Sequence, residues 1–313
     1  MSKLRRGYTT GVHALLAFKL ALDTLKATHT HSQAISQKMD NDDLDVTKGC
    51  EIVVSLSYDL DDLKLSSIPH NPYIIQNLHL YAGSGVGVVT KDGLKPPKGY
   101  GAINPTPLNA IASYYQSQNI DKSKPLYATI SVIDGIHIAT QTANAKVGVL
   151  GGISILGSSG FVKPVSSDAY IQSIRTEIEF AKANGHKSIV LTLGNSAYNI
   201  AKSQYDQEMI VEIGNFVYDA IEIAIQNGMQ IILIIGVAKA IKLSQGAKNT
   251  HNRFGSIDFK LLSSWVEYDV TNANTVKNVC DIVGKTKVTN IAQTKAKAKI
   301  KEWFGIDIKI QIT

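Results

Sequence analysis

The chain has 313 residues, of which 44% are hydrophobic and 19% charged, and its formal net charge is +6. This length and composition are typical of a folded protein of about two domains. No apolar run in the sequence approaches the roughly 18 residues of a membrane span, and two distant cysteines exclude a disulfide framework or a cysteine-based metal site. We therefore expect a cytoplasmic protein with no membrane partner.

The chain starts with a short basic segment, and its strongest basic run lies near the C-terminus. The start, MSKLRRGYTTG, lacks the small-residue cleavage site of a signal peptide. The stretch from Lys285 to Lys301 lacks interleaved aromatic side chains, which favours a solvated helix face over a nucleic-acid platform. A mild basic excess suits a small polyanionic substrate, and we predict no nucleic-acid partner. The sequence leaves open whether the protein forms a homo-oligomer.

The first half of the chain mixes helices, strands and glycine-rich turns. Residues 12–27 predict a helix, which Thr9 or Thr10 can cap, and the polar stretch 29–45 predicts a loop. Further predicted elements are strands at 51–58, 74–81 and 127–133, a helix at 107–118, and tight turns in the glycine-rich stretches 82–107 and 148–160. We assign residues 1–160 to an α+β domain.

After residue 160 a strand, a glycine turn and a helix follow one another three times. The pattern predicts strands at 188–193, 209–213 and 229–235, and helices near 259–268, 273–283 and 289–304. Such alternation is typical of a parallel α/β domain, so residues 161–313 predict a Rossmann-like fold. The last strand, 306–312, is expected to return to the first domain.

The turns that follow these three strands are candidate ligand contacts. Glycine lets the backbone approach a ligand closely, and free N–H groups at helix starts hold carboxylates or phosphates. In open α/β sheets such sites lie at the carboxyl ends of the strands. The candidates are Gly194, Asn195, Gly214, Asn215 and Gly236. Ordinary strand-to-helix turns remain an equally good interpretation of the pattern.

Other signals are weaker. GSGVG at residues 83–87 is not followed by the Gly-Lys-Ser/Thr of a phosphate loop, and the hydrolase and zinc-protease motifs are absent from the sequence. His251 is a candidate general base because histidine is the side chain most often used for proton transfer near neutral pH, although a structural role is equally plausible. The acidic cluster from Asp40 to Asp45 could do acid–base work, but such a run is more often a solvated loop. We predict no metal site.

Taken in order, several segments resemble one family. They are LRRGYTTGVHALLAFKLAL (4–22), DNDDLDVTKGCEI (40–52), GSGVGVVTKDGL (83–94), AINPTPLNAI (102–111), VGVLGGISILGSSGFVKPVS (147–166), LTLGN (191–195), GNFVYDAI (214–221) and NTHNRFGSID (249–258). This ordered set is similar to the cobalt-precorrin-5B C1-methyltransferases of anaerobic cobalamin (vitamin B12) synthesis. The resemblance covers about residues 4–258.

The resemblance implies methyl transfer from S-adenosylmethionine to carbon 1 of an anionic cobalt-containing tetrapyrrole. Positioning and exclusion of water can then provide most of the catalysis. The catalytic candidates are Thr9, Thr10, Asp45 and His251. The five strand-end residues above become the candidates for binding the methyl donor. The substrate-binding candidates, which lie in or beside the motifs, are Thr47, Gly83, Ser84, Gly85, Lys91, Asn104, Gly151, Gly152, Ser154, Lys163, Lys239, Thr250 and Arg253.

The sequence departs from the family pattern at two places. The usual Gly-Thr-Cys is Gly11-Val12-His13, and only Lys239 remains of a Gly-His-x-Gly-Lys element, beside Gly236, Val237 and Ala238. These departures keep open a catalytically altered tetrapyrrole-binding protein. An ATP-using small-molecule kinase, suggested by GSGVG, is a further alternative.

Overall fold

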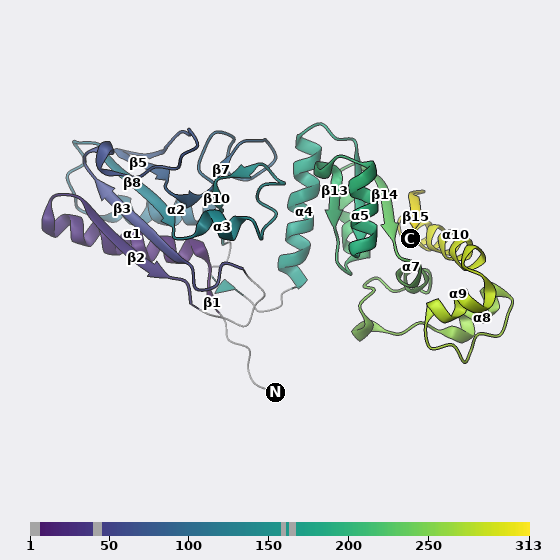
Figure 1. Cartoon of the computed structure of the whole chain (residues 1–313). Helices are drawn as coiled ribbons and strands as arrows, with labels where there is room; N and C mark the ends of the chain where they lie inside the picture. Colours follow the sequence, from purple (N-terminus) through teal and green to yellow (C-terminus); the bar gives the residue numbers. More distant parts are fainter. Residues whose placement is uncertain (1–6, 40–45, 158–160, 163–166) are drawn as a thin grey trace. The chain divides into compact units, whose positions relative to one another are not determined.

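The structure is a computed structural model that describes residues 7–39, 46–157, 161–162 and 167–313. It is a mixed α/β protein (Figure 1). The chain divides into two compact units, Met1–Ser166 and Ser167–Thr313, which we call the N-terminal and C-terminal units. Among the described residues, no helix combines the length and hydropathy that crossing a membrane requires.

The N-terminal unit is built on a mixed five-stranded sheet. Its strands, in spatial order, are β2 (Ser32–Gln37), β3 (Glu51–Ser57), β8 (Leu126–Val132), β5 (Leu78–Ala82) and β4 (Tyr73–Ile75). Only β5 and β8 are parallel within this sheet. Helices α1 (Thr10–Thr28) and α2 (Pro105–Ser117) share a buried core with one face of the sheet.

Helix α1 confirms the predicted first helix and its cap. The Thr9 hydroxyl accepts a hydrogen bond from the Val12 N–H, and His29 ends the helix in a left-handed conformation. The loop predicted at 29–45 was wrong in part, because β2 lies within it. β2 is a polar edge strand that pairs with β3 alone in this sheet, and its buried Ser32 donates to the Ala21 carbonyl. Its inward positions are the small or polar Ser32, Ala34 and Ser36, and its apolar Ile35 is exposed, which concealed the strand pattern.

Two other differences concern the rest of this unit. The single strand predicted at 74–81 is a hairpin of β4 and β5, because Gln76 takes a left-handed turn conformation without being glycine. The remaining short elements are β1 (Gly7–Tyr8) paired with β11 (Phe161–Val162), β6 (Gly85–Val86) with β10 (Gly152–Ile153), β7 (Val88–Val89) with β9 (Val149–Leu150), a 3-10 turn at Leu60–Asp62, and α3 (Gly135–Ala139).

The C-terminal unit contains a four-stranded parallel sheet. Its spatial order is β13 (Ile210–Glu212), β12 (Ser188–Leu193), β14 (Gln230–Ile235) and β15 (Lys309–Ile312). The predicted strands are therefore present. The expectation that the last strand returns to the first domain was wrong, because β15 pairs in parallel with β14. Its alternating pattern indicated a strand but carried no information on its partner.

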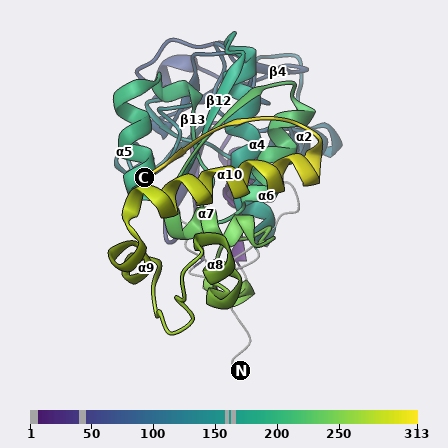
Figure 2. The ribbon, with the colours of Figure 1, turned by 90° about the vertical axis from the view of Figure 1, so that its right-hand side faces the viewer.

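Helices cover both faces of this sheet. They are α4 (Ser167–Ala183), α5 (Asn195–Gln204), α6 (Val217–Gln226), α7 (Val237–Ser244), α8 (Phe259–Val266), α9 (Val276–Val283) and α10 (Lys285–Phe304), with 3-10 turns at Gln207–Met209 and Asn252–Phe254. Helix α5 packs on the face that carries Val190 and Ile234. Helices α4, α6, α7 and α10 share the core of the opposite face, and α10 runs along α7 (Figure 2).

Candidate functional site

The carboxyl edge of the parallel sheet gathers the five predicted donor-binding residues. Gly194 leads from β12 into α5, which starts at Asn195, and Gly236 leads from β14 into α7. Gly214 and Asn215 follow β13 at the same edge. Helices α5 and α7 leave neighbouring strands toward opposite faces, so their turns diverge. This divergence is where open α/β sheets bind ligands.

The first turns of α5 and α7 present backbone N–H groups at this edge. Within the described chain, no side chain caps either helix. The Val237 N–H donates to the Thr313 carbonyl at 3.3 Å, which ties the start of α7 to the end of β15. Uncapped helix starts favour carboxylate or phosphate groups, because their N–H groups and the helix dipole both point outward.

A hydrogen-bond network joins three of the predicted residues beside these turns. The Lys239 Nζ donates to the Asn215 Oδ1 at 2.6 Å and to the Thr250 carbonyl at 3.0 Å. The Thr250 hydroxyl donates to the same Asn215 oxygen at 3.1 Å, and its side chain is fully buried. Burial, and secondarily the charge of Lys242, lower the pKa of Lys239. Asn215, predicted to bind the donor, and Lys239 and Thr250, predicted to bind the substrate, therefore form one cluster.

A second lysine of α7 holds the loop that follows this helix. Lys242 is buried, and its Nζ donates to the Asn252 Oδ1 at 2.6 Å and to the Gly255 carbonyl at 3.0 Å. Sequence reasoning missed Lys242. Its position three residues after Lys239 places both on one side of α7, which was the available signal.

His251 and Arg253 lie on the loop that Lys242 holds. The His251 Nδ1 accepts a hydrogen bond from the Arg253 N–H, so the imidazole caps a 3-10 turn. The Arg253 guanidinium lies 4.5 Å from the centre of the Phe254 ring. Both predicted residues are exposed, and their side chains are engaged with the loop itself.

Tyr170 closes the turn after β13 and was also missed. Its hydroxyl donates to the Glu212 carbonyl at 3.2 Å, and its ring stacks on Phe216. A Cβ added to Gly214 would lie 3.0 Å from the Tyr170 ring. Burial, and then the charges of Glu212 and Glu177, raise the pKa of this phenol.

In the N-terminal unit, Thr9 and Thr10 fasten the start of α1. The Thr10 hydroxyl accepts from the Leu156 N–H at 2.9 Å and lies within hydrogen-bonding distance of the Leu156 and Ser154 carbonyls. Thr9 caps the helix, and its hydroxyl would be 2.2 Å from a Cβ on Gly157. These two catalytic candidates therefore have structural partners, and Ser154 lies beside them.

The glycine-rich segments of this unit are closely packed backbone. A Cβ on Gly85 would lie 2.0 Å from the Val132 carbonyl oxygen, and one on Gly152 would lie 2.2 Å from the Gly85 oxygen. The N–H groups of Gly83 and Gly87 donate to the Ile130 and Ile153 carbonyls. The Val86 N–H also donates, to the Gly83 carbonyl, so most donors of GSGVG are occupied, which argues against a phosphate-binding loop and against the kinase hypothesis.

The other substrate-binding candidates occupy varied surroundings. Asn104 precedes α2, and its N–H donates to the Ile155 carbonyl. The Lys91 stem packs against Gly148, and Thr47 accepts a hydrogen bond from the buried Lys38 Nζ. Ser84 is exposed beside Gly85, and Gly151 lies against Ile68. Asp45 and Lys163 lie outside the described residues, as does the rest of the acidic cluster.

His13, one of the departures from the family pattern, is buried in the N-terminal unit. It is 3% exposed, its Nδ1 lies 2.8 Å from the Ser36 hydroxyl, and its ring is edge-on to Tyr8. Its Nε2 is buried without a hydrogen-bond partner among the described residues. Burial, and then the charge of Lys38, lower the pKa of this imidazole.

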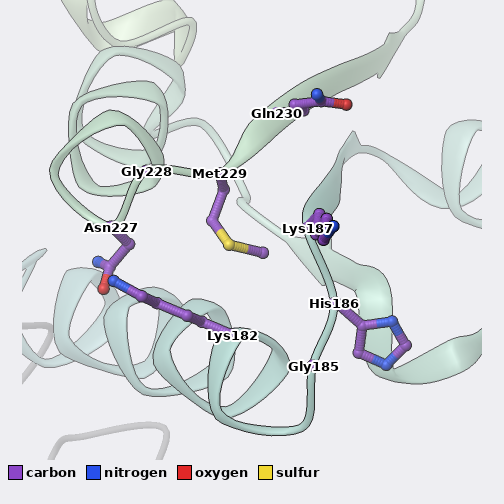
Figure 3. Close-up of a pocket in the computed structure, with 8 residues that line it drawn as sticks. All are labelled: Lys182, Gly185, His186, Lys187, Asn227, Gly228, Met229 and Gln230. Carbon is purple, nitrogen blue, oxygen red and sulfur yellow. The ribbon is translucent and has the colours of Figure 1, made fainter.

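A hollow lies at the opposite edge of the parallel sheet. It has a volume of about 390 Å³ and is lined by Lys182, His186, Lys187 and Met229 among others (Figure 3). Helices α4 and α6 end there, so carbonyl groups face it rather than N–H groups. Because ligands of open α/β sheets bind at the carboxyl ends of strands, we do not take this hollow to be the functional site.

The described residues hold no group of three or more His, Cys, Asp or Glu side chains arranged for a metal ion. The carboxyl edge instead offers amide, hydroxyl and backbone groups beside two lysines. Such groups can bind and orient a polar ligand.

Comparison with known proteins identifies similar chains. The family described as CbiD matches residues 17–164. A cobalt-precorrin-5B C(1)-methyltransferase of Methanococcus aeolicus is 34% identical over 91% of this chain and 77% of its own length. The protein of that name from Clostridium botulinum is 35% identical over 92% of this chain and 84% of its own.

One solved structure is also similar. It is the cobalamin biosynthesis protein (cbiD) from Archaeoglobus fulgidus, which is 20% identical and is matched over 98% of this chain and 87% of that chain, with a TM-score of 0.39.

Proposed function

This chain belongs to the CbiD family, and on that premise we propose that it methylates carbon 1 of cobalt-precorrin-5B in cobalamin synthesis, with S-adenosylmethionine as the methyl donor. The observation that carries the proposal is the similarity to relatives that are named for this reaction. This chain is 34% and 35% identical to two of them and matches 77% and 84% of their length. The C1-methyltransferase resemblance of the ordered motifs agrees with those names.

We assign the donor to the carboxyl edge of the C-terminal unit, which we take to be a Rossmann-like domain. S-adenosylmethionine supplies an already activated methyl group when bound. Its carboxylate and ribose oxygens need hydrogen-bond donors, and the uncapped starts of α5 and α7 together with the Asn215 amide are such donors. The residues that would hold it are Gly194, Asn195, Gly214, Asn215 and Gly236.

The remaining catalytic task is positioning. An electron-rich ring carbon needs to face the methyl group in line, and exclusion of water protects that geometry. Lysine, arginine and backbone N–H groups are suited to the carboxylates of the tetrapyrrole. We propose that residues of the N-terminal motifs, among them Asn104, Lys91 and Ser154, contribute to that substrate site. The cytoplasmic location and the lack of a nucleic-acid partner stay predictions.

Mass spectrometry of cobalt-precorrin-5B incubated with the protein and S-adenosylmethionine tests the proposal. We expect one added methyl group per tetrapyrrole and an equal amount of S-adenosylhomocysteine. Binding of the tetrapyrrole with no mass increase would contradict it. That result would favour the catalytically altered binding protein, the alternative that the changed residue His13 and the Gly236–Ala238 segment motivate.

A further inference from the structure

The side-chain amide of Asn215 has a fixed orientation. An ammonium group can only donate hydrogen bonds, so the atom 2.6 Å from the Lys239 Nζ is the amide oxygen. The Thr250 hydroxyl donates to the same oxygen at 3.1 Å, which occupies both of its lone pairs. The Asn215 NH₂ group therefore turns away from Lys239 and Thr250.

The NH₂ group of Asn215 is an accessible donor. The side chain is only half-buried, and no described residue accepts a hydrogen bond from its Nδ2. Asn215 lies just after β13, at the carboxyl edge of the sheet. This edge therefore presents a donor of fixed direction to a ligand, where a freely rotating amide could present either a donor or an acceptor.

Lys239 connects three separate segments through its ammonium group. It extends from α7 to Asn215 after β13 and to Thr250 in the loop beyond α7. Its hydrogen bonds at this position go to neutral oxygens, and burial lowers its pKa. An ammonium with two short bonds inside the protein is better placed to hold its neighbours than to bind a substrate carboxylate.

We propose that Lys239 is a positioning residue, and that it orients Asn215 so that the amide NH₂ selects an acceptor oxygen of the methyl donor. This inference rests on the proposed function, because it takes the donor to bind at this edge. The acceptor is the carboxylate of the donor's amino-acid part, because a ribose hydroxyl can also donate and would not need a fixed NH₂ group. Two ligands that differ in the amino-acid part test this assignment.

The deciding variant is Asn215→Asp. A carboxylate keeps the hydrogen bonds from Lys239 and Thr250 and adds a charge pair with Lys239, so the variant should melt no lower than the unmodified protein. It cannot donate, however, and it faces the ligand oxygen with a second acceptor. Calorimetry should show affinity for S-adenosylhomocysteine reduced by at least about tenfold. The control is Asn272→Asp, which adds the same charge at an exposed position of the C-terminal unit. This variant should bind S-adenosylhomocysteine as tightly as the unmodified protein.

Methylthioadenosine, which lacks the amino-acid part, identifies the acceptor. If Asn215→Asp weakens S-adenosylhomocysteine but not methylthioadenosine, the acceptor is the carboxylate. If it weakens both ligands equally, the carboxylate is not the acceptor and the inference is overturned. Equal affinity of Asn215→Asp and the unmodified protein for S-adenosylhomocysteine overturns the inference and leaves the proposed function intact. No binding of S-adenosylhomocysteine by the unmodified protein, alone and with tetrapyrrole, overturns both.

Variants of Lys239 test the positioning role. Lys239→Met should weaken S-adenosylhomocysteine binding about as much as Asn215→Ala does. The double variant should bind only slightly more weakly than either single variant, because both changes remove the same Lys239–Asn215 hydrogen bond. Lys239→Arg keeps a cationic donor and should restore most of the affinity. Strictly additive losses in the double variant would show that Lys239 acts independently of Asn215 and would overturn its assignment.

Discussion

The two units use glycine for opposite physical reasons. In the N-terminal unit, Gly85 and Gly152 have no room for a side chain, because an added Cβ would lie 2.0 and 2.2 Å from carbonyl oxygens. In the C-terminal unit, Gly194 has nothing within 4 Å of such a Cβ, and Gly236 has only a Thr313 atom at 3.9 Å. The first pair lets backbones pack together, whereas the second leaves space beside two helix starts.

This difference shows that glycine density does not by itself locate a ligand site. The segment GSGVG is denser in glycine than any strand-end turn of the C-terminal unit, yet the N–H groups of Gly83 and Gly87 are bonded to carbonyls. What distinguishes a ligand-binding turn is open space with free donors.

The largest expected effect is that of Gly85→Ala. The methyl group would strike the Val132 carbonyl in a left-handed backbone conformation, so we expect the N-terminal unit to lose about 3 kcal/mol or more of stability. Urea unfolding, followed by far-UV circular dichroism, measures this loss of stability. A variant as stable as the unmodified protein would show that the glycines of the N-terminal unit are not required for close packing of the backbone.

Lys242→Met should have the next largest effect. The variant loses the hydrogen bonds to Asn252 and Gly255 and leaves both acceptors without their partner, which should destabilise the C-terminal unit by about 2 kcal/mol. Thermal denaturation checks this, with the exposed Lys260→Met as the matched control. Equal melting of the two variants would show that the loop after α7 is held by other contacts.

Gly236→Ala separates stability from binding. Gly236 has an ordinary extended φ and open surroundings, so alanine should cost less than about 1 kcal/mol of folding stability. If the methyl donor approaches this backbone, the added methyl group should weaken S-adenosylhomocysteine binding by about tenfold. Calorimetry and a melting curve on the same sample measure both. Unchanged affinity would place the donor away from the start of α7.

His13 should give a small pH effect in the N-terminal unit. Its pKa is lower in the folded protein than in the unfolded chain, because burial and then Lys38 disfavour the imidazolium. The resulting stability is complete above pH 6.5 and declines as the pH falls from there toward the folded-state pKa. Urea unfolding at a series of pH values should show this slope flattened in His13→Cys. Replacement of the exposed His31 by Gln should leave the slope of stability against pH unchanged. If His13→Cys has the same slope as the unmodified protein, the pH effect belongs to another group.

Much of this architecture could be predicted from the sequence. Strands 188–193, 209–213 and 229–235 were found because buried parallel strands are continuous apolar runs, and the turns after them define one edge of the sheet. β2 was missed because its inward positions are small or polar and its apolar Ile35 is exposed. The hairpin at Gln76 was missed because its turn lacks glycine. The partner of β15 depends on tertiary packing, which alternation alone does not specify.

The candidate site divides in the same way. The sequence identified Asn215, Lys239 and Thr250 as separate contacts, but only the folded chain brings them together. Sequence distance concealed the network, since Lys239 follows Asn215 by an entire helix and strand. Tyr170 had no motif to mark it, because its role is packing, and Lys242 was marked only by its spacing of three residues from Lys239.

The late position of β15 has a consequence for synthesis of the protein. β14 is bordered by β12 on one side, and its other edge is closed only by residues 309–312. While α10 and the residues after it are still within the ribosome, the isoleucine-rich β14 presents an open backbone edge to other nascent chains. We therefore expect C-terminal truncations before β15 to aggregate during expression, while the strands of the N-terminal unit, already synthesised, can pair among themselves.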